Sequence, residues 1–334
     1  MRILVTGGTG YIGSNTVAKL IKYGYDVVIV DNFSNSKPIV LEKLKKVTGK
    51  DIKFYKIDLC NKRKLKVVFE ENKIDAVIHF AGYKVAGESV EKPLKYYRNN
   101  IDSTLSVLEL MVKYKVKKMV FSSSAAVYGN PEELPLKETS KLNVTNPYGA
   151  TKLYIEGILR DLYNSDNEFR IAILRYFNPV GCDETGLLGE EANGAPSNLI
   201  PYISMVANKT LPYLKIFGND YDTKDGTGIR DYIHVVDLAM GHIRALEFLD
   251  KNAKLEYYNI GTGKGYSVLE IVEEFQKVNN VSVPYKFAPR RSGDIVISYA
   301  DPSKALKELN WKAEYNLKDM VKSAYDYVLN NKEK

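Results

Sequence analysis

Short apolar runs alternate with amphipathic stretches through the first half of the chain. The apolar runs are dense in Val, Ile and Phe with little polar alternation, which is typical of parallel strands covered on both faces. They predict strands at residues 3–5, 26–30, 52–56, 76–80, 118–121 and 170–176. The amphipathic stretches predict helices at residues 11–23, 62–72, 100–114 and 147–165. This order indicates the α/β fold class, with a doubly wound parallel (Rossmann) sheet and right-handed crossovers.

The pattern changes after Asn178-Pro179. Residues 179–196 are rich in Gly, Asp, Glu and Asn without periodicity, and we interpret them as a functional loop. Beyond this loop, predicted helices at 198–207, 235–250, 267–279 and 317–330 alternate with short strands and turns. We therefore expect a first domain at residues 1–178. A second, smaller α/β domain at 179–334 should pack closely on it, and its segments can return to the sheet.

Composition and charge narrow the class of protein. The 334 residues are 45% hydrophobic and 27% charged, close to soluble globular averages. No apolar run approaches the ~18–20 residues that span a bilayer, and a strand begins at once, which leaves no room for a signal peptide. The net charge of +7 comes from dispersed lysines, so we expect neither nucleic acid nor membrane as a partner. Two cysteines and three scattered histidines favour a cytoplasmic protein without a metal site.

A glycine motif follows the first predicted strand and opens the first predicted helix. In Gly8-x-Gly10-x-x-Gly13, glycine tightens the turn and lets the backbone approach a pyrophosphate, which the helix N-terminus attracts. Asp31 closes the second strand, where a carboxylate accepts hydrogen bonds from the adenosine ribose and repels the extra phosphate of NADP. The motif therefore predicts NAD. His79 lies inside a strand and is interpreted as a core histidine.

A phenol and an ammonium lie one turn apart on another predicted helix. Asn146-Pro147 is typical of an N-cap and a first helical position, which puts Tyr148 in the first turn. Tyr148 and Lys152 share a face with apolar residues, so Lys152 should point to the sheet. A phenol has a pKa of ~10 in water. A nearby ammonium and a cationic nicotinamide favour the phenolate, so Tyr148 can exchange a proton near neutrality.

A string of hydroxyls, Ser122-Ser123-Ser124, ends the fifth predicted strand at the same edge of the sheet. The chain resembles the extended short-chain dehydrogenase/reductases in three features: Thr6-Gly7-x-x-Gly10-x-x-Gly13, Ser124 and Tyr148-x-x-x-Lys152. More narrowly, five strings are similar to the UDP-glucose 4-epimerase family: 81–84 (AGYK), 122–129 (SSSAAVYG), 175–181 (RYFNPVG), 225–234 (DGTGIRDYIH) and 290–294 (RRSGD).

The resemblance implies redox chemistry on a sugar alcohol, with an NAD that is tightly held and is reduced and reoxidised in each turnover. It implies that Tyr148 removes the proton of the sugar 4-hydroxyl while the C4 hydride passes to nicotinamide. Ser124 would bond that oxygen, and Lys152 would bond the nicotinamide ribose and lower the tyrosine pKa. The 4-keto sugar then swings about its diphosphate and takes the hydride back on its other face, which interconverts UDP-glucose and UDP-galactose.

The resemblance also assigns binding positions, NAD to residues 1–178 and the UDP-sugar to 179–334. Some positions match cofactor contacts of the family, and others lie at the carboxyl ends of the predicted strands, where ligands collect. They are Gly7, Gly10, Tyr11, Ile12, Gly13, Asp31, Asn32, Asn35, Ser36, Asp58, Leu59, Phe80, Ala81, Gly82, Lys84, Asn99 and Phe177. Those that match nucleotide-sugar contacts are Asn178, Asn198, Leu199, Phe217, Arg230, Tyr232, Arg291, Asp294 and Ser298. Arginines suit the diphosphate because they form charge-assisted, often bidentate hydrogen bonds.

Three alternatives stay open. A nucleotide-sugar 4,6-dehydratase shares the fold and cofactor, but it needs an acid–base pair after the serine, where this chain has Ala125-Ala126. A UDP-hexuronate 4-epimerase would need polar groups for the sugar carboxylate, and none can be assigned. A non-catalytic NAD-sensing protein typically lacks the Tyr/Lys pair, which is intact here.

Two finer expectations come from the resemblance. Some family members place a tyrosine where this chain has Ser298, next to Tyr299. Because serine leaves room beside the C2 substituent of the sugar, we expect UDP-GlcNAc and UDP-GalNAc to be accepted as well. The family commonly forms homodimers through paired helices, for which 100–114 and 147–165 are the candidates.

Overall fold

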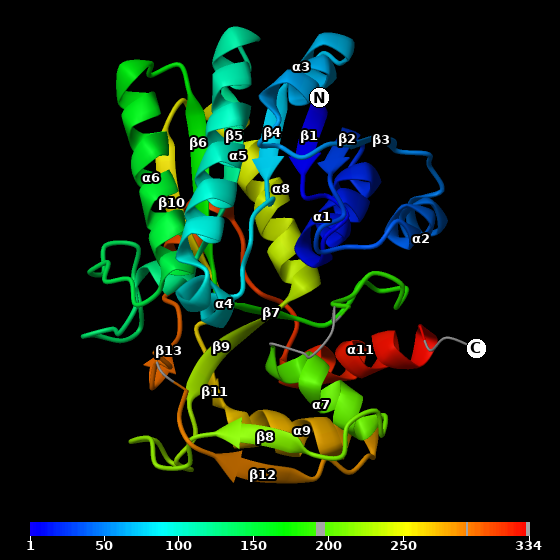
Figure 1. Ribbon diagram of the computed structural model, residues 1–334, viewed down its shortest axis with the longest axis vertical. Helices are drawn as coiled ribbons and strands as arrows, with labels where there is room; N and C mark the ends of the chain where they lie inside the picture. Colours follow the sequence, from blue (N-terminus) through cyan, green and yellow to red (C-terminus); the bar gives the residue numbers. More distant parts are fainter. Residues whose placement is uncertain (192–197, 292, 332–334) are drawn as a thin grey trace.

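The computed structural model of the chain describes residues 1–191, 198–291 and 293–331 (Figure 1). Ser292 and residues 192–196 of the predicted loop therefore lie outside the described residues. Seven parallel strands form the main sheet in the order β10-β6-β5-β4-β1-β2-β3. Their bounds are β1 (Arg2–Thr6), β2 (Asp26–Asp31), β3 (Lys53–Lys56), β4 (Ala76–His79), β5 (Lys118–Ser124), β6 (Arg170–Tyr176) and β10 (Leu255–Ile260). The predicted doubly wound sheet is confirmed, and its six predicted strands differ from these bounds only at their ends.

Helices cover both faces of this sheet, which explains why its strands are apolar on both sides. One face packs against α1 (Tyr11–Lys22), α2 (Ile39–Thr48), α8 (Val235–Lys251) and α10 (Ser303–Leu309). The other packs against α3 (Lys62–Glu71), α5 (Pro93–Lys113) and α6 (Pro147–Ser165). Figure 1 shows α6, α5 and α3 side by side in front of the sheet.

The structure changes the predicted helices in two ways. The helix expected to begin at residue 100 begins at Pro93, because proline fits the first helical position and Tyr96 is buried one turn before Asn100. Three short helices, α2, α4 (Ala86–Glu91) and α10, were not predicted. Each buries only one or two side chains, which leaves no clear helical periodicity in the sequence.

The second region contains smaller sheets with their own core. Strand β9 (Ile229–His234) pairs with β7 (Asn178–Val180), β11 (Gly265–Ser267) and β13 (Ile297–Ser298), while β8 (Leu214–Phe217) pairs with β12 (Tyr285–Ala288). Helices α7 (Leu199–Ala207), α9 (Val268–Asn279) and α11 (Leu317–Asn330) pack around them. Strand β7 takes the first residues of the predicted loop 179–196, because residues 178–180 form a parallel ladder with β9.

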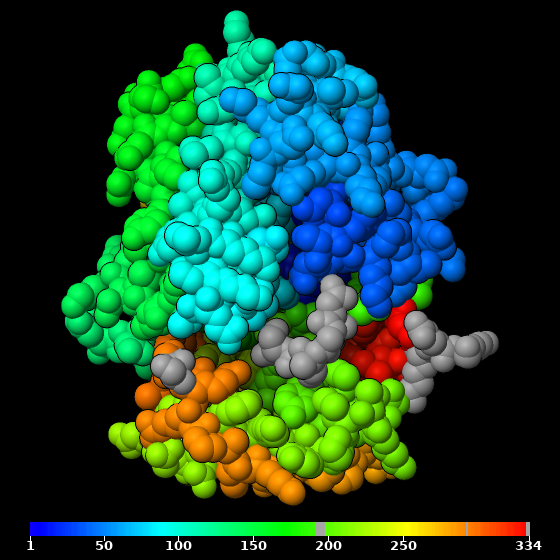
Figure 2. Space-filling view, in the orientation of Figure 1, coloured from blue at the N-terminus to red at the C-terminus, as the bar shows by residue number. Residues whose placement is uncertain are grey.

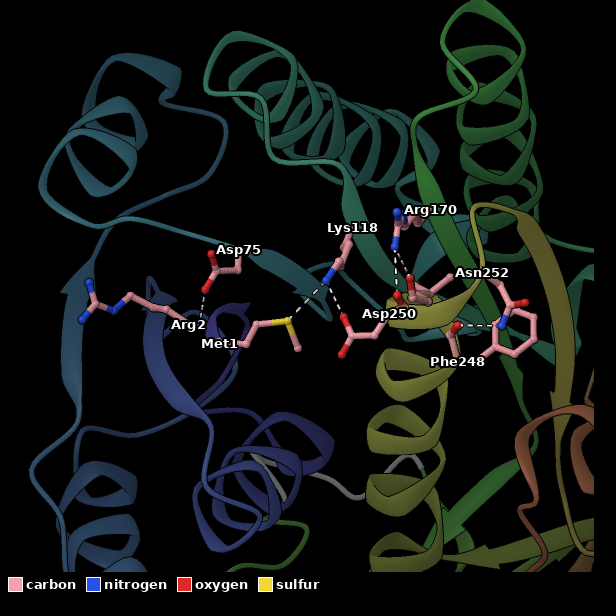
Figure 3. A network of polar contacts seen from close by, with 9 residues as sticks. Met1, Arg2, Asp75, Lys118, Arg170, Phe248, Asp250 and Asn252 are labelled. Atoms are coloured by element: carbon pink, nitrogen blue, oxygen red, sulfur yellow. Dashed lines mark hydrogen bonds and ion pairs between the residues drawn. The ribbon is translucent and has the colours of Figure 1, made fainter.

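Two elements of the second half return to the main sheet. Helix α8 packs on it and β10 extends it beside β6. Figure 3 shows how the C-terminal end of α8 is attached: Lys118 lies between Met1 and Asp250, and Arg170 donates to the carbonyls of Leu249 and Asp250 at 3.1 and 3.0 Å. A cation at the last turn of a helix is favourable because the free carbonyls there are partly negative. These contacts fix the two halves of the chain to each other.

The surfaces of the two halves meet along a line across the molecule, with the blue to cyan residues on one side and the lime and orange residues on the other (Figure 2). None of the helices within the described ranges is both long and apolar enough to cross a membrane.

Candidate functional site

A cavity of about 600 Å³ lies at the C-terminal ends of β1, β2, β4, β5 and β6. Ligands of open parallel sheets collect at this edge, where the strand order reverses. Side chains from both regions form its wall, including Asn198 and Pro201 from around α7 and Tyr327 from α11.

The glycine turn between β1 and α1 has two positions, Gly7 and Gly13, at which only glycine fits. Gly7 has a φ of +70°, and a Cβ there would lie 2.8 Å from the backbone nitrogen of Ala81. A Cβ on Gly13 would lie 2.2 Å from the carbonyl oxygen of Gly7. No described side chain caps the N-terminus of α1 at Gly10, and the first turn of this helix lines the cavity. This is the cradle that a pyrophosphate needs.

Asp31 lies on the rim of the cavity, at the end of β2. Its carboxylate accepts hydrogen bonds from the backbone nitrogens of Thr9, at 3.2 Å, and Phe33, at 2.9 Å. The bond from Thr9 attaches the end of β2 to the glycine turn. The two bonds together hold the negative charge beside the pocket, where it can select between ribose hydroxyls and a phosphate.

The N-terminus of α6 has the predicted geometry. Asn146 accepts a hydrogen bond from the backbone nitrogen of Gly149 at 2.9 Å, and Pro147 occupies the first turn. Lys152 is buried, and its Nζ donates to the carbonyl oxygen of Ser122 at 2.6 Å. Burial lowers the pKa of Lys152 to about 8, and the carboxylate of Glu156 acts in the opposite direction. The expectation that Lys152 points to the sheet is confirmed.

Tyr148 is in the cavity wall with Ser124. Burial raises the pKa of the Tyr148 phenol, whereas its hydrogen bond with Ser124 and the charge of Lys84 lower it. The cation that acts on the phenol in this structure is thus Lys84, which the sequence placed among the cofactor contacts. Lys152 instead lies over the ring of Phe121, 5.0 Å from its centroid, because its ammonium is turned to the strand.

Two neighbouring carboxylates at the cavity were missed by sequence reasoning. Glu190 accepts from Lys84 at 2.8 Å and from Asn198 at 2.6 Å, and Glu191 pairs with Lys37 at 2.6 Å. They belong to the loop that its composition marked as functional, but nothing in the sequence singled out these two residues. Tyr176 and Tyr327 also line the cavity, and no local signal could have found the latter, in the last helix.

His79 is a core histidine, as predicted. It is buried, with hydrogen bonds to the hydroxyls of Thr6 at 2.7 Å and Thr104 at 3.0 Å. Burial, and then the charge of Lys152, lowers the pKa of His79 to about 3. It is therefore neutral at physiological pH.

The cavity brings together every predicted cofactor residue and all three predicted catalytic residues. Among the predicted nucleotide-sugar residues, only Asn198 lines it. Most of the others gather around β9: Asn178 is in register with Tyr232, and Ser298, which is buried, is in register with Arg230. Leu199 is the first residue of α7.

A cationic cluster lies at the ends of β8 and β9. Arg291 lies over the ring of Phe217, 4.8 Å from its centroid, and pairs with Asp294 at 2.9 Å. Burial raises the pKa of Tyr232 to about 12, and the charges of Arg230 and Arg291 lower it. The arrangement offers two guanidinium groups and an aromatic face to an anionic, planar ligand.

Comparison with known proteins gives consistent findings. A family model described as GDP-mannose 4,6 dehydratase matches residues 4–324. The UDP-glucose 4-epimerase of Bacillus subtilis is 54% identical over 331 residues, which are 99% of this chain and 98% of that protein. The structure of UDP-glucose 4-epimerase from Bifidobacterium longum in complex with NAD+ and UDP has a TM-score of 0.96 and 51% identity, covering 99% of both chains. That of Stenotrophomonas maltophila, with bound NAD and formylated UDP-arabinopyranose, has a TM-score of 0.97 and 45% identity, covering 99% of this chain and 98% of that one.

Proposed function

The chain belongs to the UDP-glucose 4-epimerase family of extended short-chain dehydrogenase/reductases, and from this premise we propose that it interconverts UDP-glucose and UDP-galactose through a transient 4-keto sugar. It is an NAD-dependent isomerase. The single observation that carries this function is the cavity that unites the glycine turn with Ser124, Tyr148 and Lys152.

The residues present fit NAD. The glycine turn leaves no space for a Cβ at Gly13, and Asp31 holds a carboxylate at the rim, so the pyrophosphate and the adenosine ribose would bind there. When bound, NAD supplies the acceptor that takes the C4 hydride and returns it. We assign residues 1–178 to NAD and residues 179–334 to the UDP-sugar, with α8 and β10 contributing to the sheet of the first domain.

The side chains of the chain divide the remaining work. Tyr148 takes the proton of the sugar 4-hydroxyl and later returns it, since its phenol faces the cavity. Ser124 orients the same oxygen, consistent with its hydrogen bond to the phenol. Lys84 supplies the positive charge that favours the phenolate against the effect of burial. We assign the ammonium of Lys152, which the carbonyl oxygen of Ser122 holds at the same edge of the sheet, to the nicotinamide ribose.

The UDP end of the substrate has to stay bound while the sugar turns. We assign it to Phe217, Arg230 and Arg291, with Asn178, Asn198, Leu199, Tyr232 and Asp294 as further contacts. The close approach of Arg291 to Phe217 and the charges of Arg230 and Arg291 beside the buried Tyr232 support this assignment.

A dehydratase, which the name of the family model suggests, is disfavoured by the residues after Ser124. Ala125 and Ala126 form a short 3-10 helix there, and alanine cannot transfer a proton. The identity to curated epimerases over nearly the whole chain favours epimerisation over the elimination of water.

Three finer properties complete the proposal. The serine at position 298, on the strand beside Arg230, supports activity on the UDP-GlcNAc and UDP-GalNAc pair. A homodimer through α5 and α6 is supported by exposed apolar side chains on these helices, Leu94 with 80% and Tyr154 with 53% of its surface exposed. We also propose a cytoplasmic protein, because its two cysteines, Cys60 and Cys182, are free. The dispersed lysines support neither nucleic acid nor membrane as a partner.

The test is to incubate the purified protein, without added NAD, with each of the four UDP-sugars and with UDP-glucuronate, and to measure epimer ratios. We expect UDP-glucose and UDP-galactose to approach one equilibrium from both sides. Conversion of UDP-glucuronate alone would favour a hexuronate epimerase. If a preparation that contains NAD converts none of these sugars, the proposed function is wrong.

A further inference from the structure

A buried ion pair joins three elements of the site without touching the cavity. Glu156 of α6 and Arg175 of β6 form a bidentate contact, with Nε–Oε1 and Nη2–Oε2 distances of 3.0 and 2.7 Å. Each side chain is only 3% exposed. The Ser123 hydroxyl of β5 donates to the same Oε1 at 2.5 Å. Burying two charges is costly unless their geometry and hydrogen bonds compensate, so this pair calls for an explanation beyond stability.

On two of the three elements it joins, α6 and β5, the network of the pair lies next to predicted catalytic groups. Along α6, Glu156 follows Tyr148 and Lys152 at the spacing of one helical turn, so the three share a face. On β5, Ser122 accepts from Lys152 and Ser123 donates to Glu156, so consecutive residues of one strand hold consecutive turns of the helix.

The third element brings the wall of the cavity into the same network. Arg175 directly precedes Tyr176 and Phe177, which line the cavity. Its Nη1 also donates to the hydroxyl of Tyr128 at 2.9 Å, and that hydroxyl donates to Asn259 at 2.6 Å. A displacement of Glu156 would therefore move α6 relative to both strands that complete the site.

From this geometry we propose that Glu156 is a positioning residue of the reaction: held by Arg175 and Ser123, it fixes Lys152 and keeps its ammonium charged. The inference rests on the proposed function, because it assigns Lys152 a role in that reaction. It goes beyond that function by adding a carboxylate, and the arginine that holds this carboxylate in place.

The electrostatics of Lys152 support the proposal. Burial lowers the pKa of Lys152 to about 8, and Glu156 raises it. Two other titratable groups lie near Lys152. His79 of β4 is neutral, and the charge of Lys152 contributes to lowering its pKa. Tyr148 lies on the same face of α6. Arg175 lies behind Glu156 and would oppose an ammonium if the carboxylate were neutralised. Without the charge at 156, Lys152 should lose its proton at a lower pH.

The decisive experiment compares pH–rate profiles of the NAD-loaded wild type and E156Q. Because the protonated Lys152 is the active form, activity falls as pH rises through its pKa. We call this decline of activity at high pH the alkaline limb of the profile. In E156Q the alkaline limb should lie about 1 pH unit lower than in the wild type. We expect kcat to fall by about 10- to 100-fold, with a smaller change in KM, because the ammonium and the phenol lose their fixed position. NAD content should remain that of the wild type.

Two further variants separate positioning from stability. E156Q leaves Arg175 as an unpaired buried charge, which destabilises the fold. E156Q/R175M removes both charges and should restore the melting temperature, whereas the alkaline limb should return only part of the way, because the opposing arginine is gone but the carboxylate is still missing. E156D keeps the charge with a shorter side chain, so its limb should stay at the wild-type pH. E256Q is the control: Glu256 lies on β10 of the same sheet and pairs with Lys304 of α10, so its replacement should leave kcat and the limb unchanged.

An E156Q variant whose alkaline limb stays at the wild-type pH overturns the proposal. So does an E156Q/R175M variant in which both kcat and the limb return to wild type, because the pair would then serve stability alone. Failure of the proposed function is a separate result: in that case the wild type itself does not epimerise UDP-sugars.

Discussion

The ammonium of Lys152 and the carbonyl oxygen of Ser122 are 2.6 Å apart and joined by a hydrogen bond. Together with the bond from Ser123 to Glu156, it attaches the helix that carries Tyr148 to the strand that ends in Ser124. Because a carbonyl accepts a bond from either a charged or a neutral amine, it fixes the position of Lys152 but not its charge. The charge depends on burial and on Glu156.

Replacing Tyr148 by phenylalanine removes the oxygen to which we assign the proton exchange and leaves the ring in the cavity wall. We expect Tyr148→Phe to lower turnover by about 10²- to 10⁴-fold or more, with NAD still bound. The measurement is kcat with UDP-galactose, together with the NAD released on denaturation. Tyr154→Phe is the matched control, because Tyr154 is on the same helix and 53% exposed. Near-normal turnover of Tyr148→Phe would place the proton transfer on another group.

The carboxylate of Asp31 should set the preference for NAD over NADP. It lies at the rim of the cavity, where it would accept from ribose hydroxyls and repel a phosphate. In Asp31→Ala we expect the ratio of NADP to NAD affinity to rise by at least about tenfold, or about 1.4 kcal/mol. Reconstitution of stripped protein with each dinucleotide measures this ratio. Asp26→Ala, at the opposite end of the same strand, is the control. An unchanged ratio would refute the ribose assignment.

A larger side chain at position 298 should exclude the N-acetyl group. Ser298 is buried on β13 in register with Arg230. Ser298→Tyr should lower the ratio of UDP-GlcNAc to UDP-glucose turnover by about tenfold or more, because a bulky group is rejected by a filled pocket. The ratio cancels any general loss of activity from overpacking. Ser303→Tyr, at an exposed position of α10, is the control. If the UDP-GlcNAc to UDP-glucose turnover ratio is the same in Ser298→Tyr and in the wild type, Ser298 does not control access of the C2 substituent.

The three histidines should make the fold less stable in mild acid. Burial lowers the pKa of His79 to about 3, and those of His234 and His242 to about 4. Each is neutral in the folded state, whereas the unfolded chain takes up a proton below pH ~6.5. Stability is therefore present above that pH and is lost as pH falls toward 4, by about 2 kcal/mol per histidine at pH ~5.

Urea unfolding at neutral pH and at pH ~5 measures this loss. His234→Gln tests the assignment, because glutamine can still bond the Ser323 hydroxyl that His234 contacts at 2.9 Å but does not titrate. Its stability should depend less on pH than that of the wild type. Identical pH dependence in both proteins would mean that other groups, such as buried carboxylates, account for the acid loss.

Much of the site could be predicted from the sequence because its signals are local. The glycine turn, the Asn146-Pro147 start of α6 and the serines that end β5 each depend on the conformation of a few consecutive residues. Parallel strands then carry such segments to one edge of the sheet, so the cavity contains every predicted cofactor residue. The β–α alternation likewise determined the main sheet.

Only the tertiary structure decided which distant side chains meet. The pairing of Glu156 with Arg175, that of Lys84 with Glu190, and the place of Tyr327 in the cavity wall join residues from different elements. The return of α8 and β10 to the first sheet is of the same kind. Such contacts cannot be recognised from the neighbouring residues in the sequence. A charged residue that is buried against a remote partner can have the same sequence neighbours as one that is exposed to water. The packing of the folded chain selects the partner and, with it, the charge state of the groups at the site.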